Sequence, residues 1–203
     1  AVRPRVLLGW EFGAGFEHVN RLREVARPLR QDGWEPVFAL RELATGHRVR
    51  AEGFRVLQAP VPPSLVAGFP KFRCGSYGEI IAAYGFGDPD ITGTMLAAWD
   101  ELIASVGPRA VVADYSPYLS LAAYGRLPVV AIGDGFVSPP GALAEFPLLH
   151  RNGTRPFDHG KILREINRLQ AMRGAPLVST LPGLIGGAAQ IVCTYPELDA
   201  YRR

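Results

Sequence analysis

Short apolar runs alternate with amphipathic segments along most of this chain of 203 residues. The runs at 5–9, 36–40, 54–60, 110–114, 128–132 and 191–194 are rich in branched residues, as buried strands are. Helices are expected at 17–31, 92–106 and 158–173, and another opening at Ser116 and Pro117. Because each parallel connection needs a crossover, the alternation predicts an α/β fold with a doubly wound parallel sheet and helices on both faces. We expect one domain over residues 1–203.

Composition narrows the class of protein. The chain is 48% hydrophobic, which is globular composition, and its 22 basic and 19 acidic residues leave a net charge of only +3. The arginines are scattered, so nucleic acid is not expected as a partner. Cys74 and Cys193 have neither metal-ligand spacing nor a disulfide pattern, which favours a reducing cytoplasm and no metal, although a single disulfide stays open.

Two segments bear on membranes and export. The apolar stretch at the N-terminus is too short for a signal peptide and runs into the first expected strand. Residues 174–196 carry no charge and approach the length of a membrane span, but prolines and glycines interrupt them. We interpret this segment as a buried part of the domain and expect no transmembrane span.

A glycine loop follows the first expected strand. Gly13 and Gly15 resemble the start of a dinucleotide-binding fingerprint, yet the third glycine of that fingerprint is replaced by His18. The second strand also ends on Arg41 and Glu42 without a clear acidic ribose ligand. Both departures argue against binding of NAD.

His18 stands instead at the expected start of the first helix. The positive end of the helix dipole disfavours the imidazolium, so the ring would stay neutral and able to accept a proton. A carboxylate on the other ring nitrogen would fix its tautomer. Asp114 ends a strand that we expect beside the first in the sheet and is placed to be that partner, and Asp134 is the competing candidate. The alternative is that His18 satisfies a backbone group and that Asp114 caps the helix after it.

At these residues the chain resembles a known family. "GWEFGAGFEHVNRLREVARPLRQDGWEPVFAL", "VVADYSPYLSLAAYGRLPVVAIGDGFVSPP" and "QIVCTYPELDAY" are similar to the N-terminal half of GT-B nucleotide-sugar-dependent glycosyltransferases, especially the UDP-glucuronosyl and macrolide enzymes. The resemblance implies a Rossmann-like acceptor-binding domain in which His18 is the general base and Asp114 orients it. Many relatives have a glycine directly before the histidine, where this chain has Glu17.

The resemblance also implies what the rest of the enzyme contributes. The co-substrate would be a nucleotide sugar, with no metal and no other cofactor. Its site would lie in a C-terminal domain, supplied by the same polypeptide or a partner subunit, so this chain alone would be inactive. Two other interpretations stay open: half of a sugar-nucleotide 2-epimerase, or a non-catalytic ligand-binding domain.

Aromatic residues after the expected strands suggest an acceptor pocket. A lipid, aromatic or polyketide-like acceptor would find apolar and stacking surface there, or the same side chains are core. The candidate acceptor-binding residues are Phe16, Glu17, Phe69, Phe72, Tyr77, Tyr115 and Phe136.

Overall fold

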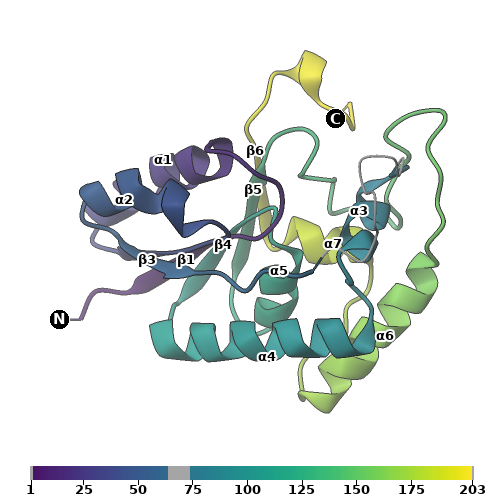
Figure 1. Cartoon of the computed structure of the whole chain (residues 1–203), viewed down its shortest axis with the longest axis horizontal. Coiled ribbons are helices and arrows are strands. Elements are labelled where there is room, and N and C mark those ends of the chain that lie inside the picture. Colours follow the sequence, from purple (N-terminus) through teal and green to yellow (C-terminus); the bar gives the residue numbers. More distant parts are fainter. Residues whose placement is uncertain (1, 64–73, 203) are drawn as a thin grey trace.

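The computed structural model describes residues 2–63 and 74–202, so Phe69 and Phe72 lie outside the described residues. Six parallel strands form one sheet in the order β3-β2-β1-β4-β5-β6 (Figure 1). They are β1 (Arg5–Trp10), β2 (Glu35–Leu40), β3 (Arg55–Gln58), β4 (Ala110–Asp114), β5 (Val129–Gly133) and β6 (Ala189–Val192). The predicted doubly wound α/β class is confirmed.

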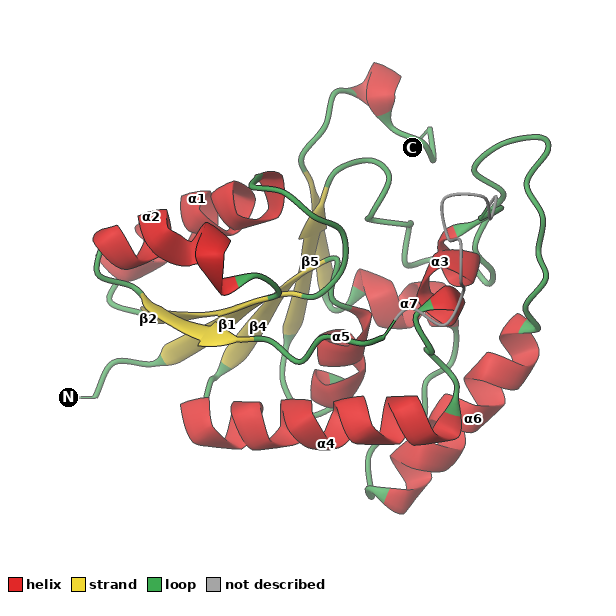
Figure 2. Cartoon of the chain, in the orientation of Figure 1, coloured by secondary structure: helices red, strands yellow, loops and turns green. Residues whose placement is uncertain are grey.

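Helices cover both faces of this sheet (Figure 2). One face carries α1 (Glu17–Gln31) and α2 (His47–Ala51), which follows a short 3-10 turn, η1 (Leu43–Gly46). The other face carries α3 (Tyr77–Ala83), α4 (Pro89–Val106), α5 (Pro117–Ala123), α6 (His159–Met172) and α7 (Leu181–Gly186). A second 3-10 turn, η3 (Pro196–Leu198), follows β6.

Strand β1 separates two hydrophobic cores. Its residues alternate between the faces, so Leu8 packs with α1 while Leu7 belongs to the core of α4 and α5. Gly9 lets α5 approach closely, because a Cβ atom there would lie 2.2 Å from Cδ2 of Leu119. The close packing fixes the start of α5 beside the carboxyl end of β1.

The long helices and the strands lie within a few residues of their predicted positions. Helix α1 spans the predicted residues and continues past Pro28, and the backbone N–H of Asp32 donates to the Pro28 carbonyl at 2.9 Å. The proline-rich region 61–90 contains α3, which the sequence pattern did not locate. The uncharged segment 174–196 contains α7 and β6.

Burial of that uncharged segment is only partial. Helix α7 is buried, but β6 is an edge strand with alternate residues exposed, and Ile191 is 47% exposed. The prediction of a buried segment is therefore confirmed for α7 and wrong for β6. Across the described residues, every helix falls short of the length and apolarity that crossing a membrane requires.

Candidate functional site

The carboxyl ends of β1 and β4 meet at one edge of the sheet. These strands are neighbours, and Trp10 pairs in register with Asp114. The loop after β1 leads directly into α1, so His18, the second residue of α1, is brought over the end of β4. Ligands of open α/β folds gather at this edge.

His18 and Asp114 form a buried pair. Nδ1 of His18 lies 2.9 Å from Oδ1 of Asp114, with 4% and 0% of the two residues exposed. Because an ionised carboxylate can only accept, the pairing puts the ring hydrogen on Nδ1 and leaves the lone pair on Nε2. Of the two candidate carboxylates, Asp114 is the one that contacts His18.

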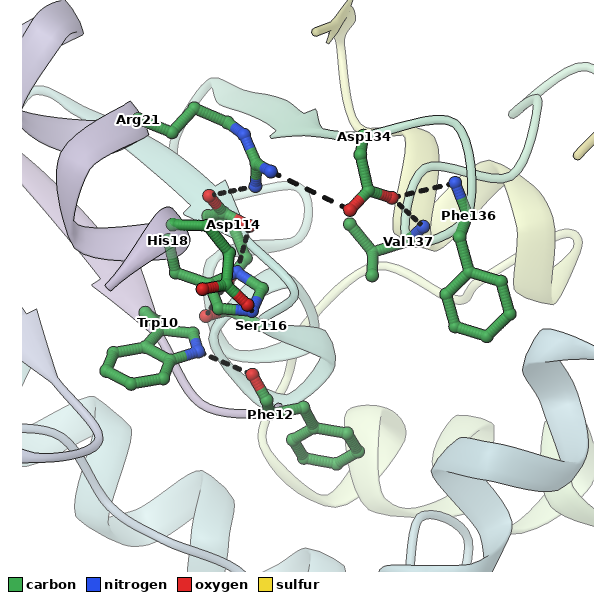
Figure 3. Close-up of polar contacts among 10 residues, drawn as sticks. Trp10, Phe12, His18, Arg21, Asp114, Ser116, Asp134, Phe136 and Val137 are labelled. Atoms are coloured by element: carbon green, nitrogen blue, oxygen red, sulfur yellow. Dashed lines mark hydrogen bonds and ion pairs between the residues drawn. The ribbon is translucent and has the colours of Figure 1, made fainter. Parts of the chain in front are cut away.

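Arg21 joins this pair from the next turn of α1. Its Nη1 donates to Oδ2 of Asp114 at 2.6 Å, and its Nη2 lies 3.7 Å from Oδ2 of Asp134 (Figure 3). Asp134 itself is held by the loop after β5, where its Oδ1 accepts from the backbone N–H groups of Phe136 and Val137. The two candidate carboxylates are thus connected through one guanidinium.

The His18 ring lies between an indole and a glycine. The ring of Trp10 stacks on it, with centroids 5.1 Å apart and an angle of 16° between the planes. On the free-nitrogen side, a Cβ atom at Gly13 would lie 2.8 Å from Nε2. Gly13 also has φ +80°, and Gly15 has φ +100°, both in the left-handed region that favours glycine. Because Gly13 has no side chain, Nε2 is not covered from that side.

A second buried acid supports the loop after β1. Both carboxylate oxygens of Glu11 accept backbone N–H groups at the start of α5, from Leu119 at 2.9 Å and Tyr118 at 3.0 Å. Burial raises the pKa of Glu11 from 4.5 to about 8, against the opposing effect of those hydrogen bonds. Helix α5 opens as predicted, with Ser116 as the N-cap residue and Pro117 at the first helical position, although the Ser116 side chain makes no capping hydrogen bond.

The chain between Asp114 and α5 adopts an uncommon backbone conformation. Tyr115 has φ +49°, and its carbonyl accepts the backbone N–H of Phe12 at 3.1 Å. A non-glycine residue in this region is strained, and such positions concentrate at functional sites. The turn connects the loops that follow β1 and β4.

The candidate acceptor-binding residues divide by exposure. Phe16 and Phe136 are 45% and 42% exposed, after β1 and β5 respectively. Glu17 follows Phe16 in sequence, and its Oε1 lies 3.9 Å from Nε2 of His18. Tyr77 and Tyr115 are buried, and burial raises the pKa of both phenols. Tyr77 and Tyr115 therefore belong to the core as the structure stands, while Phe16, Glu17 and Phe136 are available to a ligand.

A groove of about 460 Å³ lies at the other end of the strands, where β5 begins. It is lined by Tyr124 and Leu127 after α5, by Val129 at the start of β5, and by small residues of α7 and its flanks. His18 does not line it. The groove is thus separate from the imidazole site.

The thiols and acids of the described residues form neither a disulfide nor a metal site. Cys74 and Cys193 are free cysteines, so the open possibility of a disulfide between them is not realised. Within residues 2–63 and 74–202 there is no cluster of three or more His, Cys, Asp or Glu side chains that could hold a metal ion.

Sequence reasoning missed Arg21 and the stacking of Trp10 on His18. Arg21 stands three residues after His18, and side chains at that spacing share one face of a helix. That spacing was the available signal. The spacing identifies Arg21 as part of the site only when the position of α1 over the end of β4 is also known.

The fold defines the structural class of this chain. The chain has a Rossmann-like domain of the type found in GT-B glycosyltransferases, and the resemblance seen in the sequence is confirmed at the level of the fold. No family model matches the chain, and no curated protein matches it.

Two solved glycosyltransferases are similar over nearly the whole chain. SnogD from Streptomyces nogalater is 18% identical, with a TM-score of 0.53 over 95% of this chain and 46% of its own. SsfS6 from Streptomyces sp. SF2575 is 14% identical, with a TM-score of 0.51 over 96% of this chain and 51% of its own. The chain therefore spans about half the length of these enzymes.

Proposed function

We propose that this chain is the acceptor-binding domain of an inverting glycosyltransferase, with His18 as the general base. The observation that carries the proposal is the buried His18–Asp114 pair at the ligand-binding edge of a sheet with the glycosyltransferase fold. Nε2 is the ring nitrogen left to accept a proton, and the loop beside it carries no side chain at Gly13.

The proposed reaction joins an acceptor hydroxyl to the sugar of a nucleotide-sugar donor. As the acceptor oxygen attacks the anomeric carbon, its proton passes to Nε2 of His18. The bond from the anomeric carbon to the diphosphate breaks, and the nucleoside diphosphate leaves with the electron pair. Asp114 stabilises the positive charge that develops on the ring.

Acceptor contacts would come from the exposed residues near this edge. Phe16 and Phe136 present aromatic surface from the loops after β1 and β5, and Glu17 adds a carboxylate 3.9 Å from Nε2 of His18. We propose an apolar or aromatic small molecule, or a lipid, that carries a hydroxyl group. The nucleotide-sugar site would belong to a further domain or subunit, so this chain alone should not transfer sugar. We further propose that the protein acts in the cytoplasm.

The test is made on the natural polypeptide purified from its source cells. It is supplied with UDP- and TDP-sugars and hydroxylated aromatic or polyketide acceptors, and glycosylated product is measured by mass spectrometry. His18→Gln should lower kcat by roughly 10²- to 10⁴-fold, the usual contribution of a positioned general base. The acceptor KM should change much less.

His159→Gln is the matched control, because His159 also contacts a buried carboxylate, Glu79, at 2.9 Å. This variant should keep the wild-type rate at temperatures where it is folded. An unchanged rate in His18→Gln would overturn the base assignment. Epimerisation of the nucleotide sugar without acceptor would replace transfer by 2-epimerase chemistry, and acceptor binding without either reaction would leave a binding domain.

A further inference from the structure

Asp114 divides its two carboxylate oxygens between two partners from one helix. Oδ1 faces Nδ1 of His18 at 2.9 Å, and Oδ2 accepts from Nη1 of Arg21 at 2.6 Å. The carboxylate is fully buried and Arg21 is nearly so, with 12% of its side chain exposed. A buried carboxylate with no cation beside it is strongly disfavoured, and a guanidinium keeps its charge throughout the working range of pH.

We propose that Arg21 is a positioning residue that keeps Asp114 ionised and moderates how strongly the carboxylate draws a proton onto His18. This inference deepens the proposed function and rests on it, because it concerns the basicity of the proposed base. Without Arg21, the His18 ring would be the group left in contact with the buried carboxylate that could supply a positive charge, which favours the imidazolium. With Arg21, the guanidinium shares the carboxylate with the ring, so Asp114 orients Nδ1 while drawing a proton onto the ring less strongly.

Other charged or titratable groups also face this cluster. Glu17 on α1 lies 3.9 Å from Nε2 of His18, and Asp134 in the loop after β5 lies 3.7 Å from Arg21. Cys193, directly after β6, interacts electrostatically with Arg21 and both aspartates, and burial raises the pKa of its thiol. The Tyr115 ring lies 6.1 Å from the His18 ring. Among these groups Arg21 is the cation, and it contacts the carboxylate that holds the ring.

Arg27, six residues further along α1, is an arginine whose ion pairs are largely exposed to solvent. It pairs with Glu52 and Glu24, which are 25% and 61% exposed, and its own side chain is 40% exposed. Solvent screens such pairs, so their removal has little effect at a distance. Arg27→Met is therefore a matched control for Arg21→Met, with the same substitution on the same helix.

The direct test follows the His18 ring of this chain by NMR as the pH is varied. The His18 signal is assigned from the spectrum of His18→Gln, and His47, His150 and His159 serve as internal references. Nitrogen shifts should place the ring hydrogen on Nδ1 in the wild type. In Arg21→Met the midpoint of the His18 titration should move to higher pH by about one unit, whereas Arg27→Met and Arg21→Lys should stay close to wild type.

Arg21→Met can leave Asp114 without a cation and so impair folding, and two further variants keep the inference testable. Asp114→Asn leaves the cation beside the ring, and the double variant Arg21→Met/Asp114→Asn removes both charges. The expected order of His18 midpoints is Arg21→Met highest, then wild type, then the double variant, then Asp114→Asn. Equal midpoints in the double variant and Asp114→Asn, or in Arg21→Met and wild type, would overturn the role of Arg21.

Kinetics of the natural polypeptide separate this inference from the proposed function. The pH at which the rate reaches half its maximum on the acid side should rise in Arg21→Met by the same shift as the NMR midpoint. If the midpoints follow the expected order but His18→Gln retains full rate, Arg21 controls the ring and the proposed base is wrong. If His18→Gln is inactive but the midpoints do not depend on residue 21, the base stands and this inference fails.

Discussion

The molecule contains two imidazole–carboxylate pairs with the same separation but opposite surroundings. His18 meets Asp114 at 2.9 Å at the edge of the sheet, and His159, the first residue of α6, meets Glu79 of α3 at 2.9 Å. In the first pair the carboxylate contacts Nδ1, which leaves Nε2, the nitrogen remote from the backbone. In the second it contacts Nε2, which leaves Nδ1 beside the histidine's own main chain.

The remaining contacts increase this difference. Glu79 accepts a hydrogen bond from the neutral hydroxyl of Ser76, whereas Asp114 accepts one from the cation Arg21. The tip of the His159 ring is pressed against α3, where a Cβ atom at Gly78 would lie 2.4 Å from Nε2. The second pair therefore joins two helices. The two pairs differ in which ring nitrogen is left free and in what surrounds it, and this difference separates the proposed base from a structural contact.

The largest expected effect is on stability, from removing each carboxylate in turn. Asp114→Ala leaves the nearly buried Arg21 with only the more distant Asp134 and should lower the free energy of unfolding by roughly 3–5 kcal/mol. Glu79→Ala leaves only a histidine and a hydroxyl, with an expected loss of about 1–3 kcal/mol. Urea unfolding of both variants measures the two losses in free energy of unfolding. A larger loss for Glu79→Ala than for Asp114→Ala would contradict the expected difference between the two pairs.

The two regions should also respond to pH in opposite directions. The raised pKa of Glu11, under the His18 loop, means that its contribution to stability is full below pH 4.5 and is lost as the pH rises to about 8. Burial opposes ionisation of Glu79, but His159 and Ser76 outweigh it and lower its pKa, so its contribution is present above pH 4.5 and is lost as the pH falls below that value.

Unfolding free energies measured from pH 3 to 8 test this contrast. Glu11→Gln should remove a decrease of up to a few kcal/mol on the alkaline side, at roughly 1.4 kcal/mol per unit of pKa difference. Glu79→Gln should remove a decrease on the acid side alone. If Glu11→Gln leaves the profile between pH 5 and 8 unchanged, Glu11 is ionised throughout that range in the folded protein.

The smallest expected effect concerns access to Nε2 of His18. Gly13→Ala and Gly33→Ala both place a methyl group at positive φ, +80° and +87°, and each should cost about 1–2 kcal/mol of stability. Only the first methyl meets His18; nothing lies within 4 Å of the second. Gly13→Ala should therefore lower the transfer rate of the natural polypeptide by roughly 10- to 100-fold, and Gly33→Ala should not. Equal rates would mean that Nε2 is reached from another side.

The sequence predicted the features of this fold that repeat along the chain. Helix α1 and strand β4 follow from local periodicity, and the adjacency of β4 to β1 was enough to favour Asp114 as the partner of His18. Helices α3 and α7 were missed because seven and six residues contain too few turns to show a helical period.

The site features that the sequence did not predict depend on contacts between residues that are distant in sequence. The start of α5 at Ser116 and Pro117 was predicted, but not that its free N–H groups would be bound by Glu11, more than a hundred residues earlier. Arg21 could not be recognised from the chain alone because its partner depends on how α1 is rotated above β4. Charged groups acquire such roles from tertiary structure, and local pattern carries little information about them.

Because His18 and Arg21 are three residues apart on one helix, they also set the register in which α1 packs on the sheet. A slide of α1 by one turn towards its N-terminus would bring Leu22 and Val25 opposite Asp114, and a slide the other way would bring Ala14 and Glu17. Either arrangement would bury the carboxylate without a donor, although the apolar face of the helix would still meet the sheet. One aspartate thereby excludes slipped packings that hydrophobic contacts alone would tolerate.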